Sequence, residues 1–165
     1  MMKLAIRLIM ALGALAGGVM PPVSAQAAGC TVCICSISVT SLNFGTYNPA
    51  NSAPTTATAS ATANCISVTL AMNATVDFAL SAGTSGNAAA RQMANGTARL
   101  NYNIYQDAGY TTVWGNGSNG GTAQSMQIVN LLSFTGTKTA YGRIPAKQYV
   151  KTGVYSDSII VTFTF

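Results

Sequence analysis

Apolar and polar residues alternate in a series of short stretches along most of the chain. Because successive side chains of a β-strand point to opposite faces, this alternation is typical of strands with one buried face. The clearest stretch is residues 158–165, which places Val161, Phe163 and Phe165 on one face and threonines on the other. Further strands are predicted at residues 35–39, 42–44, 56–64, 66–70, 75–80 and 99–105.

Segments rich in Gly, Asn, Ser and Pro separate these stretches, and such residues favour turns. About seven short strands joined by turns predict an all-β protein with an antiparallel β-sandwich. The pattern indicates neither an internal repeat nor a second domain. The turn segments lie at residues 47–54, 81–87, 95–96, 115–121 and 151–153.

The first 27 residues have the organisation of a secretory signal peptide. A basic stretch, Lys3–Arg7, precedes an apolar run at Leu8–Met20, and small residues follow up to Ala27. We predict cleavage after Ala27, with cleavage after Ala25 as the alternative. The apolar run is shorter than the roughly 20 residues of a membrane-spanning helix, so no integral membrane segment is expected after cleavage.

The chain is therefore predicted to comprise a cleaved signal peptide at 1–27, a short N-terminal segment at 28–34 and one domain at 35–165. The part after the signal peptide is long enough for a domain with its own core. An alternative is lipoprotein processing with lipidation of Cys30, because residues 27–30 loosely resemble a lipobox. Alanine stands in this segment where lipoboxes usually have leucine.

The charged residues do not indicate nucleic-acid binding. The chain has eight basic and three acidic residues, and two of the basic ones lie in the predicted signal peptide. Nucleic-acid binding requires a concentrated basic stripe. The six remaining basic residues are isolated in the sequence, which predicts a mildly basic surface: Arg91, Arg99, Lys138, Arg143, Lys147 and Lys151.

The residue types that enzymes commonly use are nearly absent. The chain has no histidine and no glutamate, and its only acids are Asp77, Asp107 and Asp157, which are far apart in the sequence. Without histidine, the usual Ser-His-Asp and Cys-His arrangements cannot form. We therefore expect a non-catalytic protein with no cofactor and no metal.

Four cysteines are expected to pair in the oxidising compartment to which the chain is exported. Of the three connectivities, the one that joins Cys33 to Cys35 is disfavoured because only one residue separates them. We prefer Cys35–Cys65, with Cys30–Cys33 as a small local loop. The alternatives are a zinc site in which Cys65 supplies the fourth thiolate, and a redox role for Cys30 and Cys33.

In its motifs the chain resembles the spore coat protein U domain family, which includes the pilins of archaic chaperone–usher fibres. The resemblance runs from about Cys35 to Phe165 and rests on the order and spacing of short motifs. These motifs are Cys35, Phe44-Gly-Thr-Tyr47, Cys65, Arg91-Gln-Met93, Leu100-Asn-Tyr-Asn-Ile-Tyr105, Asp107, Thr112-Val-Trp-Gly115, Tyr141-Gly-Arg-Ile-Pro145, Gly153-Val-Tyr-Ser-Asp157 and Val161-Thr-Phe-Thr-Phe165.

Several residues of these motifs also have a structural interpretation. Tyr102 and Trp114 have aliphatic neighbours and are expected in the core. Gly45 and Gly142 are expected to relieve backbone crowding at turns. Asp157 is expected to cap a turn.

The resemblance implies an immunoglobulin-like sandwich that lacks its final strand. A periplasmic chaperone, and then the N-terminal extension of another pilin subunit, would fill the open groove by donor-strand complementation at an outer-membrane usher. The sequence agrees, because the chain printed ends with a strand whose apolar face has nothing after it to cover the edge. The expected acceptor strand carries Ile159, Val161, Phe163 and Phe165.

The segment before Cys35 departs from a typical donor strand. Only residues 28–34 precede Cys35 after the predicted cleavage, whereas a donor needs around ten alternating residues. The chain is therefore expected to accept a strand more readily than to donate one, which suits a minor or terminal subunit. We expect export through the periplasm to the cell surface or the extracellular space.

Two other functions remain open from the sequence. One is a secreted adhesive or ligand-binding module that uses the loop at residues 115–121 or nearby aromatic residues. The other function is a self-complemented coat or matrix protein, in which the N-terminal segment fills the groove of its own domain.

For Arg143 we expect hydrogen bonds to loop carbonyls, with a binding role as the alternative.

Overall fold

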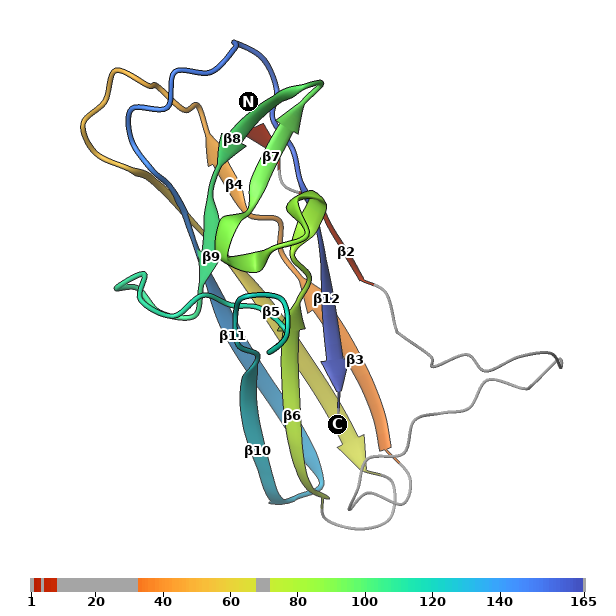
Figure 1. The fold of residues 1–165 in the computed structure, drawn as a ribbon. Coiled ribbons are helices and arrows are strands. Elements are labelled where there is room, and N and C mark those ends of the chain that lie inside the picture. The colour runs from red at the N-terminus through yellow and green to blue at the C-terminus, as the bar shows by residue number, and fades with distance from the viewer. Residues whose placement is uncertain (1, 4, 9–32, 68–71, 165) are drawn as a thin grey trace, which may run out of the picture.

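The computed structural model describes the backbone of residues 2–3, 5–8, 33–67 and 72–164, with side chains described at 34–67, 74–129 and 132–164. Two four-stranded sheets dominate this part of the chain (Figure 1). The first sheet has the order β10 (Gln124–Leu131), β6 (Met72–Leu80), β12 (Ser158–Thr164) and β2 (Ala5–Leu8). The second has the order β3 (Cys33–Val39), β5 (Thr55–Ser67), β11 (Ser133–Ile144) and β9 (Asn103–Tyr105).

Shorter elements complete the fold. The hairpin of β7 (Gln92–Asn95) and β8 (Ala98–Asn101) turns at the predicted Asn95–Gly96 position. β1 (Met2–Lys3) pairs with β4 (Asn43–Gly45). Two 3-10 turns, η1 (Gly83–Ser85) and η2 (Ala88–Ala90), lie between β6 and β7. The all-β sandwich predicted from the sequence is confirmed, and the described strands pair antiparallel except for β12 and β2, which run parallel.

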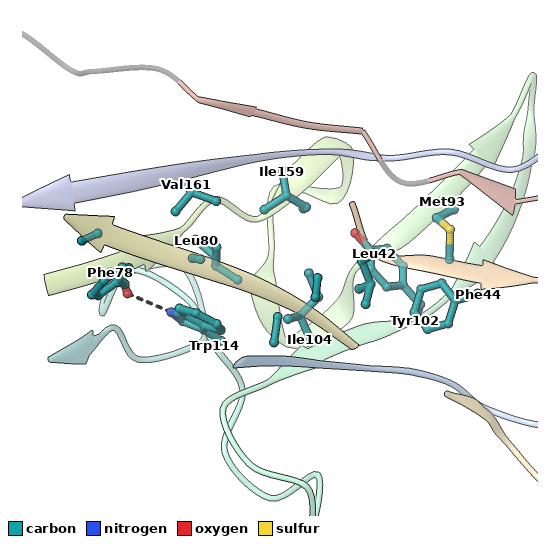
Figure 2. Packing of buried hydrophobic residues seen from close by; sticks show 14 of the residues in the cluster. Leu42, Phe44, Phe78, Leu80, Met93, Tyr102, Ile104, Trp114, Ile159 and Val161 are labelled. Atoms are coloured by element: carbon teal, nitrogen blue, oxygen red, sulfur yellow. Dashed lines mark hydrogen bonds between the residues drawn. The ribbon is translucent and has the colours of Figure 1, made fainter. Parts of the chain in front are cut away.

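The core lies between the two sheets and follows the alternation of the strands. β5 contributes small residues at every second position, whereas β6 and β12 contribute large ones, and this pairing of small and large side chains lets the two sheets pack closely. Figure 2 shows part of this cluster. Buried core residues include Ala59, Ala61, Ala63, Val76, Phe78, Leu80, Ile128, Ile159 and Val161. Tyr102 and Trp114 are buried as predicted, and the Trp114 indole donates a hydrogen bond to the Phe78 carbonyl at 2.8 Å.

Two expectations about individual strands are wrong, and two strands were missed. The strands predicted at 56–64 and 66–70 are one strand, β5, as far as Ser67, and residues 68–70 lie outside the described part of the chain. The strand predicted at 99–105 is two strands that separate at Tyr102, because β8 pairs with β7 whereas β9 pairs with β11. β10 and β11 were not predicted at all.

The prediction that Gly142 occupies a turn is also wrong, because it lies inside β11. A Cβ atom at Gly142 would lie 2.6 Å from Phe44 Cζ and 2.7 Å from Leu42 Cδ2, so glycine is needed for close packing. The interpretation of Gly45 agrees better with the structure, because this residue ends β4 with a φ of +66°, a conformation that favours glycine.

Replacing Gly142 with alanine is expected to lower the free energy of unfolding by about 1–3 kcal/mol, because the added methyl group overfills the core. Urea unfolding of the full chain measures the effect. A matched control is Thr139→Ala on the outward face of the same strand, for which a change within about 0.5 kcal/mol is expected. Equal stability of the two variants would contradict this account of Gly142.

Candidate strand-acceptor edge

β12 is the strand on which the sequence placed the acceptor edge. One of its edges pairs antiparallel with β6, where Val161 lies opposite Leu80 and Phe163 opposite Phe78. Its other edge pairs parallel with β2, with Ile159 in register with Ile6 and Val161 with Leu8 (Figure 1). The backbone that fills this edge therefore comes from the segment predicted to be the signal peptide.

The side chains of β12 take part in the core right up to this edge. Ile159 and Val161 are 0% and 1% exposed, and Figure 2 shows them in the interior of the sandwich. Phe163 is half-buried, and its ring meets that of Phe78 edge to face with centroids 5.2 Å apart. Phe165, the fourth residue of the predicted acceptor strand, lies outside the described residues.

A second strand edge is paired with the same N-terminal region. β1 pairs antiparallel with β4, with Met2 in register with Gly45 and Lys3 with Asn43. β1 and β2 thus pair with strands from two different parts of the fold, β4 and β12. A strand that fills this region would have two sets of backbone hydrogen-bonding groups to satisfy.

Asp157, the buried residue directly before β12, anchors the start of this strand. Its carboxylate accepts hydrogen bonds from the Thr84 and Ser158 amides at 2.9 and 2.8 Å and from the Tyr102 hydroxyl at 2.7 Å. Burial, together with the neighbouring Asp157 charge, raises the pKa of Tyr102 well above its usual range. The phenol therefore stays protonated and able to donate its hydrogen bond. Beyond the capping role predicted for it, Asp157 thus forms a buried link between η1, the β8–β9 junction and β12.

Ser81 adds a further link to β12. Its hydroxyl accepts a hydrogen bond from the Ile160 amide at 2.9 Å, and its own amide donates to the Ile160 carbonyl at 2.9 Å. This contact comes directly after β6, the neighbour of β12 in the sheet. The backbone of β12 is therefore held on the β6 side by contacts that do not depend on β2.

Arg91 connects the loops around this region, although the sequence suggested an exposed surface charge. Its side chain is fully buried, and it donates to the carbonyls of Ala88, Ser81 and Trp114 and to the Asn103 side chain at 2.7–3.3 Å. Burial lowers the pKa of Arg91, and the charge of the nearby Asp157 carboxylate partly offsets this lowering. The sequence contained one indication that Arg91 is buried: it is the only charged residue between Asp77 and Arg99.

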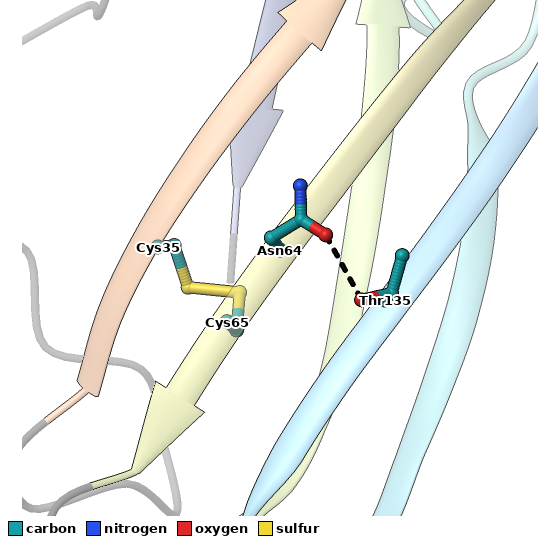
Figure 3. The surroundings of a disulfide bond; sticks show 4 residues. All are labelled: Cys35, Asn64, Cys65 and Thr135. Atoms are coloured by element: carbon teal, nitrogen blue, oxygen red, sulfur yellow. Dashed lines mark hydrogen bonds between the residues drawn. A yellow bond between two sulfur atoms is a disulfide. The ribbon is translucent and has the colours of Figure 1, made fainter.

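A disulfide joins Cys35 of β3 to Cys65 of β5, as predicted. The two residues lie directly opposite each other in register, with Cα atoms 4.1 Å apart (Figure 3). The bond fixes β3, at the edge of the second sheet, to its neighbour. The predicted Cys30–Cys33 pairing lies outside the described side chains and stays a prediction that thiol titration of the oxidised protein would test.

Other types of site find no support in the described part of the chain. No group of three or more His, Cys, Asp or Glu side chains lies close enough there to hold a metal ion. Among the same residues, no helix is long and apolar enough to cross a bilayer.

Comparison with known proteins places the chain in a family. The profile of the Spore Coat Protein U domain matches residues 23–162. Protein U of Myxococcus xanthus is 33% identical over 138 residues, which cover 75% of this chain and 71% of that protein.

Among solved structures, the fold resembles the crystal structure of the CsuC–CsuE chaperone–tip adhesion subunit pre-assembly complex from archaic chaperone–usher Csu pili of Acinetobacter baumannii. The TM-score is 0.56 and the sequence identity 23% over 81% of this chain, which spans 40% of the length of the matched chain. This likeness shows the fold, whereas the profile match over most of the sequence shows the family. The chain belongs to the Spore Coat Protein U domain family.

Proposed function

We propose that this protein is an exported structural subunit of a cell-surface fibre, and that β12 accepts a strand from a partner by donor-strand complementation. The observation that carries the proposal is the pairing of β12 with β2, a strand from the predicted signal peptide. Cleavage after Ala27 removes β1 and β2 together, and the edges of β12 and β4 lose the strands that pair with them.

The exposed edge would be unstable by itself. Backbone amide and carbonyl groups along one side of β12 would lose their partners, and Ile159 and Val161 would lie next to an open seam. A donor that buries about four apolar side chains at roughly 1.5–3 kcal/mol each would contribute about 6–12 kcal/mol of gross stabilisation. This magnitude is comparable to the whole stability of a small domain, about 5–15 kcal/mol, so a donor decides whether the fold persists.

The proposed partners follow from this requirement. A periplasmic chaperone supplies the strand in transit, an outer-membrane usher hands the subunit on, and another subunit supplies the strand in the fibre. The fold likeness to a chain of a chaperone–subunit complex from archaic pili supports this assignment. The same likeness supports a non-catalytic, structural role and a location at the cell surface.

The proposed position in the fibre is minor or terminal. β3 begins at Cys33, two residues before the boundary expected from the sequence, and Ile34 is in register with Ile66 of β5. Residues 33 and 34 are therefore already part of the sandwich. Only residues 28–32 would remain ahead of it after cleavage at Ala27, which is shorter than a donor strand.

The test uses the chain from Ala28 onward, produced with and without a peptide of residues 2–8. We expect the chain alone to aggregate and the peptide to keep it monomeric in size-exclusion chromatography. A peptide with Ile6→Ser and Leu8→Ser, the positions in register with Ile159 and Val161, should fail. The matched control with Ala5→Ser and Arg7→Ser should succeed, and a stable monomer without any donor would refute the acceptor role.

A self-complemented coat protein is the second candidate, and one observation favours it. The strand that pairs with β12 belongs to the same chain, so a protein that keeps this segment needs no partner. N-terminal sequencing of the secreted protein separates the candidates. A mature chain that begins at Ala28 favours the fibre subunit, whereas one that keeps residues 5–8 favours the coat protein.

A further inference from the structure

Three tyrosines and an arginine gather on the outward face of the second sheet, away from β12. β11 buries Ala140, Gly142 and Ile144, so its intervening residues face outward. Among these, Tyr141 lies in register with Tyr105 of β9. The Tyr–Arg cluster, as we name it, consists of Tyr105, Tyr110, Tyr141 and Arg143, all partly exposed.

The loop that follows β9 brings Tyr110 onto this cluster. The Tyr110 ring meets the Tyr105 ring edge to face, with centroids 5.5 Å apart, and the Arg143 guanidinium carbon lies 5.3 Å from the Tyr110 centroid. Tyr110 has a φ of +58°, which is uncommon for a residue with a side chain. A strained residue whose ring packs against two neighbours indicates that the loop is built to hold the ring in place.

Asp107 holds this loop. Its carboxylate accepts hydrogen bonds from the Thr111 and Thr112 amides at 2.8–3.2 Å, while its carbonyl accepts from the Tyr110 amide at 3.1 Å. The hydrogen bond from Thr112 is the main cause that lowers the pKa of Asp107, so the group is ionised at neutral pH. Its charge is directed to backbone donors, and it forms no ion pair with Arg143.

Arg143 differs in its surroundings from the other described arginines. Arg91 donates to four acceptors, and Arg99 donates to the Gly96 and Ala98 carbonyls. In the described part of the chain, the Arg143 side chain contacts the Tyr110 ring but forms no hydrogen bond and no ion pair. The expected hydrogen bonds to loop carbonyls are therefore not formed, and the N–H groups of a positioned cation remain available.

We propose that the Tyr–Arg cluster binds a carboxylated polysaccharide. The planar guanidinium matches a carboxylate with two parallel hydrogen bonds, and stacking on Tyr110 orients it in advance. Tyrosine rings combine an apolar face, suited to the C–H faces of sugar rings, with a hydroxyl at the rim. Thr56 and Thr58, exposed and in register with Arg143 and Tyr141, place further hydroxyl groups beside the cluster.

The test compares binding of the full chain to polygalacturonate and to its methyl ester, which has the same sugar backbone without the charge. Isothermal titration calorimetry should show binding of polygalacturonate and at least about tenfold weaker binding of the ester, because the charge-assisted hydrogen bonds are lost. Arg143→Gln should weaken binding of polygalacturonate by a similar factor. The matched control, Arg99→Gln, should bind within about twofold of the wild type.

Two further variants distinguish binding by the Tyr–Arg cluster from binding by simple charge attraction. Arg143→Lys keeps the charge but loses the planar fork, and Tyr110→Ala removes the ring that supports the guanidinium. Both should bind more weakly than the wild type while their circular dichroism and thermal unfolding show a folded domain. The proposal is overturned if the wild type binds the ester as well as the acid, or if Arg143→Gln or Arg143→Lys binds as tightly as the wild type.

Discussion

Replacing Arg91 with methionine is expected to lower the free energy of unfolding by about 3–5 kcal/mol. Methionine fills much of the same space but cannot donate hydrogen bonds. The carbonyls of Ser81, Ala88 and Trp114 and the side chain of Asn103 would lose their donor inside the protein. Each buried acceptor left without a partner costs about 1–3 kcal/mol, although such losses are not additive.

Urea unfolding of the full chain, refolded under oxidising conditions, measures this effect. Arg99→Met is the matched control, because Arg99 is exposed and donates to neighbouring loop carbonyls. We expect the control to change the free energy of unfolding by less than about 0.5 kcal/mol. If Arg91→Met were as stable as Arg99→Met, Arg91 would not be the link between the loops that the structure indicates.

Removing the Cys35–Cys65 disulfide is expected to lower the free energy of unfolding by about 3–4 kcal/mol. The bond closes a loop with a sequence separation of 30 residues, and its loss increases the chain entropy of the unfolded state. The double variant Cys35→Ala, Cys65→Ala avoids an unpaired thiol at either position. Because both residues face each other across two neighbouring strands, the register of β3 and β5 should survive.

Chemical denaturation with and without a reducing agent tests this prediction. Reductant should destabilise the wild type to about the level of the double variant and should leave the double variant almost unchanged. If the oxidised wild type and the double variant unfolded at the same denaturant midpoint, the disulfide would add nothing to the stability that strand pairing already provides.

The parts of the fold that could be predicted from the sequence are those in which large apolar residues mark the buried face. Residues 158–165 are the best example, because Val161 and Phe163 stand at alternate positions that pack against β6. The Cys35–Cys65 pairing was also predictable, because export requires the cysteines to pair and spacing restricts the choice. The aliphatic neighbours of Tyr102 and Trp114 likewise indicated their place in the core.

β11 could not be predicted because the middle of its inward face, from Gly136 to Gly142, carries no large apolar side chain. Gly136, Ala140 and Gly142 occupy buried positions of this strand, and small residues at these positions give no hydrophobic alternation. The reason for small residues lies in other strands: the room at Gly142 is taken by Leu42 and Phe44. Such packing depends on residues about a hundred positions apart, which no local pattern contains.

The change of partner at Tyr102 and the site residues depend on tertiary structure in the same way. The alternation at residues 99–105 puts Leu100, Tyr102 and Ile104 on one face, and all three are buried, but it does not say which neighbour each half of the segment pairs with. The Tyr–Arg cluster combines β9, β11 and a loop. The pairing of β2 with β12 joins the two ends of the printed sequence.

Hydrogen exchange of β12 tests the acceptor role most directly. In a β-strand the amides point alternately to the two neighbouring strands, so about half of those in residues 158–164 should depend on a donor. We predict that this half is protected in the full chain, exchanges rapidly in the chain from Ala28 onward, and is protected again when the peptide of residues 2–8 is added. Equal protection of all β12 amides with and without a donor would contradict the proposal that β12 is an acceptor strand.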